Sequence, residues 1–170
     1  MVSGAVPVKE VSMLQKLVLV RHGDAEFFGP EGTDESRRLT KRGAEVLAAE
    51  YPSTFEPLKD VDDITFWVSP AVRAIQTAEI AADVLDVDPD EFDMHVSLYE
   101  QDDDEFLAEL GAEGDGTVVA VGHIPFMHRI LWKLTGEDAP FSKGSVASVV
   151  FENGDIDKAT LEWFVDGPED

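Results

Sequence analysis

The stretch Lys16-Leu17-Val18-Leu19-Val20-Arg21-His22-Gly23 decides which fold we expect for this chain. An uninterrupted apolar run rich in β-branched residues is typical of a parallel strand that is buried on both faces. The run ends abruptly in Arg21-His22, and ligands of open α/β sheets bind at the carboxyl ends of the strands. We therefore expect this strand to deliver two functional side chains to a binding edge.

Two later segments repeat this arrangement. Ile64–Val68 leads into Ser69–Arg73, and Thr117–Val121 leads into Gly122-His123. A parallel sheet brings the carboxyl ends of its strands to one edge. The sequence therefore predicts that Arg21-His22, Arg73 and His123 meet there.

Three of these segments resemble signatures of the histidine phosphatase (phosphoglycerate mutase-like) superfamily: Leu19–Gly23, Ser69–Ala78 and Val121–His123. Their order and spacing also fit, and the resemblance covers most of the chain from about Leu14 onward. The superfamily implies phosphoryl transfer through a histidine, and the residues themselves suit that chemistry.

His22 is the expected nucleophile, since a neutral imidazole nitrogen attacks phosphorus and forms a phosphohistidine enzyme. Its ordinary pKa suits this role near neutral pH. Arg21 and Arg73 would clamp the phosphoryl oxygens with forked, permanently charged donors. His123 would add a hydrogen bond, as a neutral ring or as imidazolium. The competing interpretations are histidines that serve the core and arginines in surface salt bridges.

Arg37 and Glu100 are the remaining candidates. The SixA-type phosphohistidine phosphatases carry a basic residue two positions before a Leu-Thr pair, which Arg37 matches here, although a solvated basic patch explains it equally well. Many members of the superfamily protonate the leaving oxygen with a Glu that follows a strand, and Glu100 lies in the corresponding region. Asp24 and Glu26 are rivals because they lie close to His22 in the sequence.

Length and composition limit the other possibilities. The 170 residues suit one domain, which we expect over 15–170 after a flexible extension at 1–14, with Met13 as an alternative translation start. The absence of cysteine excludes disulfides, thiolate catalysis and cysteine-ligated metals. The chain has neither an apolar run that could span a bilayer nor a secretory signal, so we expect a cytoplasmic protein without a membrane partner.

The net charge of −23 arises from 36 acidic residues against 13 basic ones. Such a surface repels nucleic acid, whose binding depends on Lys and Arg. A hydrophobic content of 44% argues against a disordered acidic protein. We interpret the charge as adaptation to a salt-rich cytoplasm, where salt screens the self-repulsion.

Periodicity predicts the remaining elements. A helix follows the N-cap Thr40 and is stopped by Pro52, and further helices are expected after Pro70, near 103–110 and from Met127 to about Gly136. Met94–Leu98 reads as a short strand, and strands over 146–151 and 159–165 are joined by the hairpin signal Asn153-Gly154. The alternation predicts a three-layer α/β/α fold whose central sheet is mostly parallel, with partly antiparallel last strands.

No metal or other cofactor is expected. His123 and His128 are five residues apart and do not share a helical face, and no HExxH motif is present.

The details of the resemblance favour one subgroup. Asp24-Ala25 follows Arg21-His22-Gly23 where mutases carry Glu-Ser or Glu-Thr, and the segment between Glu100 and Thr117 is short. Both features resemble the SixA-type enzymes, which act on phosphohistidine in proteins. The alternatives are a small-molecule phosphomonoesterase with the same residues, a mutase, and a catalytically silent module that binds phosphorylated partners.

Overall fold

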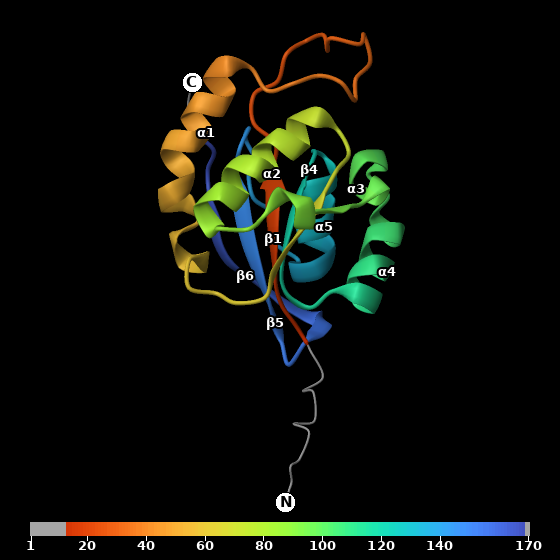
Figure 1. Ribbon diagram of the computed structural model, residues 1–170. Helices are drawn as coiled ribbons and strands as arrows, with labels where there is room; N and C mark the ends of the chain where they lie inside the picture. The colour runs from red at the N-terminus through yellow and green to blue at the C-terminus, as the bar shows by residue number, and fades with distance from the viewer. Residues whose placement is uncertain (1–12, 169–170) are drawn as a thin grey trace, which may run out of the picture.

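The computed structural model describes residues 13–168, in which helices flank both faces of a six-stranded sheet (Figure 1). The strands are β1 (Leu14–Arg21), β2 (Ile64–Val68), β3 (Asp93–Met94), β4 (Gly116–Gly122), β5 (Val146–Glu152) and β6 (Asp155–Val165). Their order across the sheet is β3-β2-β4-β1-β5-β6. The first four strands in this order are parallel, whereas β5 pairs antiparallel with both β1 and β6. The predicted three-layer α/β/α fold is confirmed.

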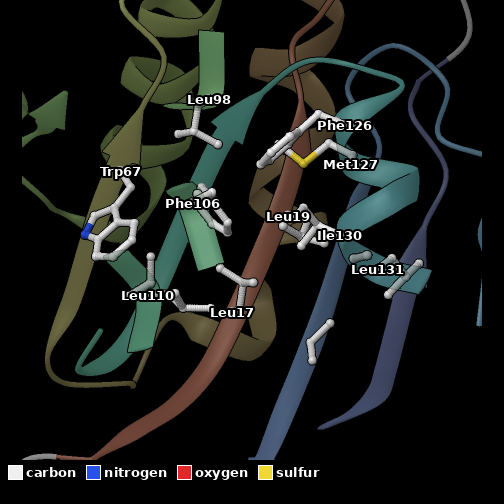
Figure 2. Packing of buried hydrophobic residues seen from close by; sticks show 14 of the residues in the cluster. Leu17, Leu19, Trp67, Leu98, Phe106, Leu110, Phe126, Met127, Ile130 and Leu131 are labelled. Carbon is white, nitrogen blue, oxygen red and sulfur yellow. The ribbon is translucent and has the colours of Figure 1, made fainter. Parts of the chain in front are cut away.

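The helices divide between the two faces of the sheet. They are α1 (Lys41–Thr54), α2 (Val72–Leu85), α3 (Val96–Glu100), α4 (Asp103–Glu113) and α5 (Phe126–Thr135), with 3-10 turns at Glu56–Leu58 and Pro89–Glu91. The side chains of α1 and α2 pack with Val18 and Val20 of β1. Those of α3, α4 and α5 pack on the opposite face with Leu17 and Leu19 (Figure 2). Strand β1 is therefore apolar at every central position because each of its two faces lies in a core.

Several local predictions are confirmed. Thr40 caps α1, and its hydroxyl oxygen accepts a hydrogen bond of 2.8 Å from the Gly43 N–H. Asn153 and Gly154 join β5 to β6 with φ values of 53° and 73°, the positive values that a tight hairpin turn of this kind requires.

The predicted strand Met94–Leu98 is wrong beyond Met94. The chain leaves the sheet at His95, whose N–H still donates to the Val68 carbonyl at 2.9 Å, and residues Val96–Glu100 form α3. The turn of α3 buries Leu98 completely in the core that Figure 2 shows. Burial of Leu98 in this core outweighs the local strand preference of Val96.

Pro52 does not end α1, contrary to the sequence prediction, because the helix continues to Thr54. Proline lacks the N–H that would bond to the carbonyl of Ala48. Ala48 is exposed, so water can satisfy that carbonyl. The buried side chains of Tyr51 and Phe55 hold the last turn against the core.

The predicted flexible extension over 1–14 falls largely on residues 1–12, which lie outside the described residues, and Leu14 is already the first residue of β1. Between residues 13 and 168, no helix has both the length and the apolar character needed to cross a membrane.

Candidate active site

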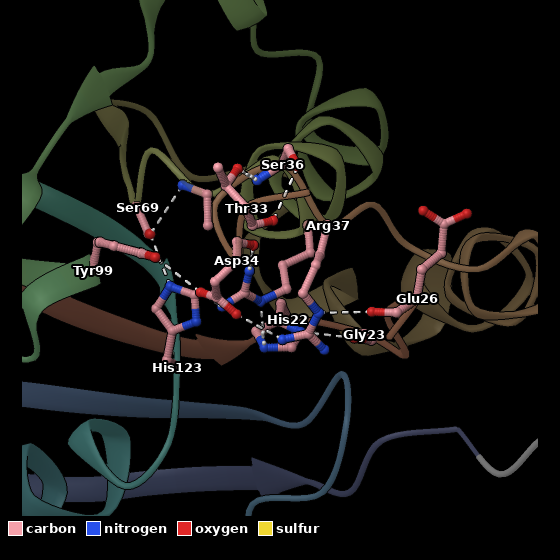
Figure 3. Close-up of polar contacts among 12 residues, drawn as sticks. His22, Gly23, Glu26, Thr33, Asp34, Ser36, Arg37, Ser69, Tyr99 and His123 are labelled. Carbon is pink, nitrogen blue, oxygen red and sulfur yellow. Dashed lines mark hydrogen bonds and ion pairs between the residues drawn. The ribbon is translucent and has the colours of Figure 1, made fainter. Parts of the chain in front are cut away.

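Four of the predicted site residues meet where β1, β2 and β4 end. The strands are parallel neighbours, and Arg21 pairs in register with Gly122, so His22 and His123 leave the sheet at the same level. The ring centroids of His22 and His123 are 5.2 Å apart. Arg73, in the first turn of α2, places its Nε 3.4 Å from the Nε2 of His22. Figure 3 shows His22, Arg37 and His123 converging with the Asp34 side chain.

These residues line a cleft of about 510 Å³. Its basic lining side chains are Arg21, Arg37, Arg73 and Lys143. In a chain with a net charge of −23, gathering three of the six arginines in one cleft creates a local site for an anion. The histidines and arginines together match the requirements of a transferring phosphoryl group, which needs positioning and charge stabilisation.

The hydrogen bonds of His22 determine which nitrogen carries its proton. Nδ1 lies 2.7 Å from the carbonyl oxygen of Gly23, which can only accept, so Nδ1 is the donor. The Nε of Arg73 can only donate, so Nε2 of His22 presents a lone pair. Burial, together with the nearby charges of Arg73 and Arg21, lowers the pKa of His22 to about 4. His22 is thus a neutral imidazole at neutral pH, with Nε2 facing the cleft.

The pKa of His123 is lowered as well. Burial, followed by the charge that His22 acquires below about pH 4 and by the charge of Arg73, lowers the pKa of His123 to about 3. Its Nε2 lies 2.8 Å from the Oγ of Ser69, which is buried at the end of β2. With this pKa, the ring of His123 is neutral at neutral pH.

Arg21 is fixed at the floor of the cleft. Its Nη1 donates to the carbonyl of Phe141 at 3.0 Å, while its Nε is buried without a hydrogen-bond partner among the described residues. Burial lowers the pKa of this guanidinium. A partly buried cation with unused donor capacity is stabilised by an incoming anion.

Asp34 is the main site residue that sequence reasoning missed. Its Oδ2 accepts from Arg73 Nη2 at 3.0 Å and from the Tyr99 hydroxyl at 2.8 Å, and its Oδ1 accepts from Arg37 Nη1 at 2.8 Å (Figure 3). Hydrogen bonds from Arg37, Tyr99 and Arg73 hold the pKa of this carboxyl far below its usual range. Nothing in the local sequence marks Asp34 among the other acids of its loop.

Arg37 lies in the cleft, as the resemblance to the SixA-type enzymes predicts. Its Nε donates to the carbonyl of Glu26 at 2.7 Å, and its side chain remains 28% exposed. The side chain is therefore held in place at the rim and is less buried than that of Arg73, which is 7% exposed.

The structure does not bring Glu100 to this cleft. Glu100 is exposed at the end of α3 and is absent from the residues that line the cleft. Its rivals do line the cleft, but each has a basic partner: the Oδ1 of Asp24 is 2.6 Å from Lys143 Nζ, and Glu26 forms a salt bridge of 3.1 Å with Arg38. These partners lower the pKa of both carboxyl groups. Neither carboxyl is thus kept protonated as a general acid at neutral pH.

Among residues 13–168, no group of three or more His, Asp and Glu side chains is placed to hold a metal ion.

Comparisons with solved structures give the same fold. The protein histidine phosphatase SixA in complex with tungstate is 24% identical, with a TM-score of 0.71 over 89% of this chain and 96% of that one. A protein from Agrobacterium tumefaciens assigned as the phosphohistidine phosphatase SixA is 21% identical, with a TM-score of 0.72 over 89% of this chain and 97% of the other. A protein with the same assignment from Nakamurella is 24% identical, with a TM-score of 0.72 over 90% and 96% of the two chains.

No curated protein sequence matches the chain. The family model for branch 1 of the histidine phosphatase superfamily matches residues 17–102, which is half of the sequence and includes His22, Arg37 and Arg73. This match agrees with the geometry at the strand ends, where the histidine and arginine side chains meet. The chain belongs to the histidine phosphatase superfamily.

Proposed function

We propose that this protein is a phosphatase that transfers a phosphoryl group to the Nε2 of His22 and then to water, and that its substrate is phosphohistidine on another protein. One observation carries the catalytic part of this proposal. Nε2 of His22 is unprotonated and faces the cleft, 3.4 Å from the guanidinium Nε of the buried Arg73. A nucleophile and a phosphate-binding cation are thus held side by side.

The reaction has two steps. In the first, Nε2 attacks phosphorus, the bond from phosphorus to Nε2 forms, and the bond from phosphorus to the leaving nitrogen or oxygen breaks. In the second, water attacks the phosphorus atom, the bond from phosphorus to Nε2 breaks, and dihydrogen phosphate leaves with both protons of the water, so that Nε2 regains its lone pair and His22 is again a neutral imidazole. Arg21, Arg73 and Arg37 balance the charge on the phosphoryl oxygens in both steps, which is the main contribution of protein groups to this chemistry.

The ionisation of the carboxylates supports phosphohistidine as the substrate. The alcohol of a phosphate ester leaves as an alkoxide unless a general acid protonates its oxygen. Asp24, Glu26 and Asp34 are poorly suited to this role, because their basic partners lower the pKa of each carboxyl group. In phosphohistidine, the leaving group is the imidazole of the substrate, and it leaves as a neutral ring when its second nitrogen is already protonated. The leaving group then carries its own proton, and no carboxylic acid is required.

The segment that follows Glu100 supports a protein as the carrier of that group, because it contributes only Gln101 to the lining of the cleft. The short segment between Glu100 and Thr117 contains only α4, whose Phe106 and Leu110 are buried against the sheet. The segment therefore packs on the face of the sheet away from α1 and α2 and does not form a cap over the cleft. The similar SixA structure is itself named a protein histidine phosphatase.

The test compares phosphate release from a histidine-phosphorylated phosphotransfer protein, from p-nitrophenyl phosphate and from an alkyl phosphate, in molar KCl with a chelator present. We expect the phosphoprotein to be preferred, His22→Ala to release no phosphate from any substrate, and acid-labile phosphate to be trapped on the wild type but not on His22→Ala. A preference for either ester would move the function to small-molecule hydrolysis. A folded protein that acts on none of them would be a phosphate-binding module.

A further inference from the structure

Two adjacent phenylalanines are the most exposed large apolar side chains of the described chain. Phe27 is 89% exposed and Phe28 is 86% exposed, compared with 61% for Trp132, the next in this group. Both lie in the loop between β1 and α1, which extends beyond the carboxyl ends of the strands (Figure 1). Phe27 also lines the catalytic cleft.

The loop that carries this pair is braced at several points. Ala25 and Leu39 form an antiparallel bridge, and the Glu26 N–H donates to the Arg38 carbonyl at 2.8 Å. Farther along, the Glu35 carbonyl accepts from the Val72 N–H at 2.9 Å. The two phenylalanines are therefore displayed from a fixed base beside the cleft. A binding element that is ordered before the partner arrives loses less entropy on association.

Neither phenylalanine packs into either of the two cores formed by residues 13–168, so their exposure does not stabilise that part of the fold. Aromatic side chains at the edge of a functional cleft are typical anchors of protein interfaces. We propose that Phe27 and Phe28 form a docking site for the phosphoprotein substrate, which presents an apolar surface patch beside its phosphorylated side chain. This inference rests on the function proposed above.

The surroundings of the pair favour a protein partner over the other possible occupants. Glu26 beside the pair is already neutralised by Arg38, but the chain as a whole carries a net charge of −23, so an anionic bilayer would repel the protein. A second copy of the chain seated on Phe27 would lie across the cleft that the substrate must enter. A phosphoprotein, in contrast, must approach this edge of the molecule to place its phosphoryl group at His22.

The experiment uses substrates with and without a protein surface. For the wild type, Phe28→Ala, Phe27→Ala and the control Trp132→Ala, kcat/KM is measured on a histidine-phosphorylated phosphotransfer protein and on free phosphohistidine. Trp132 is the matched control because it is an exposed aromatic side chain outside the cleft lining. We expect Phe28→Ala to lose about tenfold on the phosphoprotein, equivalent to about 1.4 kcal/mol, and less than twofold on free phosphohistidine. Phe27→Ala should lose at least as much on the phosphoprotein, and Trp132→Ala should change neither value.

Three results would overturn the docking site while leaving the proposed function intact. The wild type could hydrolyse the phosphoprotein with no loss in Phe28→Ala, or Phe28→Ala could lose equally on both substrates, or light scattering could show a dimer that Phe28→Ala abolishes. A different result defeats the proposed function itself: a wild type that prefers p-nitrophenyl phosphate to both phosphohistidine substrates. The two failures are therefore distinguishable. Circular dichroism of each variant verifies that the fold is retained.

Discussion

Asp34 occupies the guanidinium fork of Arg73: its Oδ2 accepts from Nη2 at 3.0 Å, and its backbone oxygen accepts from Nη1 at 2.8 Å. The same carboxylate binds Arg37 at 2.8 Å. A side chain of the protein thus neutralises the two cations that we expect to bind phosphate. A phosphoryl group must either displace this carboxylate or bind beside it.

We therefore expect Asp34→Asn to bind phosphate more tightly. Removing one like charge about 4 Å from a bound anion changes its binding by about 1 kcal/mol in a solvated site, or roughly fivefold. The measurement is the inhibition constant for inorganic phosphate in the wild type and the variant. Weaker binding by Asp34→Asn would mean that the carboxylate is needed to orient Arg73 and Arg37.

The two site histidines should titrate far below an ordinary histidine. Nuclear magnetic resonance should find the pKa of His22 near 4 and that of His123 near 3, compared with about 6.5 for an unperturbed imidazole. Tungstate, as a bound dianion, should raise both values by favouring the protonated rings. Values near 6.5 in a sample without tungstate would contradict the burial and the positive charges described for this site.

The same shifts predict that acid destabilises the fold. Between about pH 6.5 and pH 4, the unfolded chain protonates these histidines while the folded protein keeps them neutral, so the unfolded state binds more protons. The free energy of unfolding should therefore fall as the pH falls through this range. The measurement is the free energy of unfolding in urea at pH 7 and at pH 5, for the wild type and for His123→Gln. The variant should show a smaller difference between the two pH values than the wild type. An unchanged difference would mean that other groups cause the pH dependence.

Arg73 and Arg37 should differ in their importance for the rate. Arg73 is 7% exposed and touches His22, whereas Arg37 is 28% exposed and reaches the site from the rim. Loss of one preorganised, buried charge-stabilising group commonly costs about 10²-fold to 10³-fold in rate. We expect Arg73→Ala to lose this amount in kcat and Arg37→Ala to lose about tenfold, since solvent screens its charge. Equal and small losses in kcat for the two variants would mean that neither arginine stabilises the transferring phosphoryl group and that both have only a structural role.

Glu100→Gln tests the general acid that the family resemblance suggests. Because Glu100 is exposed and does not line the cleft, we expect kcat on phosphohistidine and on an alkyl phosphate to change by less than about twofold. Glu105→Gln, an exposed acid on α4, is the matched control. A loss confined to Glu100→Gln and to the alkyl phosphate would restore Glu100 as the acid and would imply a movement of α3 in the substrate complex.

Salt should stabilise the protein. With a net charge of −23, the folded chain repels itself, and raising the ionic strength from 0.1 M to 1 M shortens the screening length from about 10 Å to about 3 Å. We expect the melting temperature and the phosphatase activity both to rise with KCl over this range. A protein that is equally stable and active in dilute buffer would refute adaptation to a salt-rich cytoplasm.

The fold could be predicted from sequence because its strongest signals are local. The apolar run of β1 has to be buried on both faces, and the Asn153-Gly154 turn has to reverse the chain. Since parallel strands end at one edge, the positions of His22, Arg73 and His123 after three such runs already implied that they meet. Where the local signal was weak, as at Val96–Glu100, packing of Leu98 in the core decided the conformation instead.

The layers of the fold and the residues that converge at the strand ends thus follow from local sequence patterns. The protonation state of His22 follows from the folded structure instead, because it depends on where the chain places the Gly23 carbonyl and the Arg73 guanidinium. The same holds for the role of Asp34, which reaches Arg73 and Tyr99 across 39 and 65 residues of sequence. Such contacts are fixed by the path of a loop over the folded sheet, and no local pattern of residue types encodes that path.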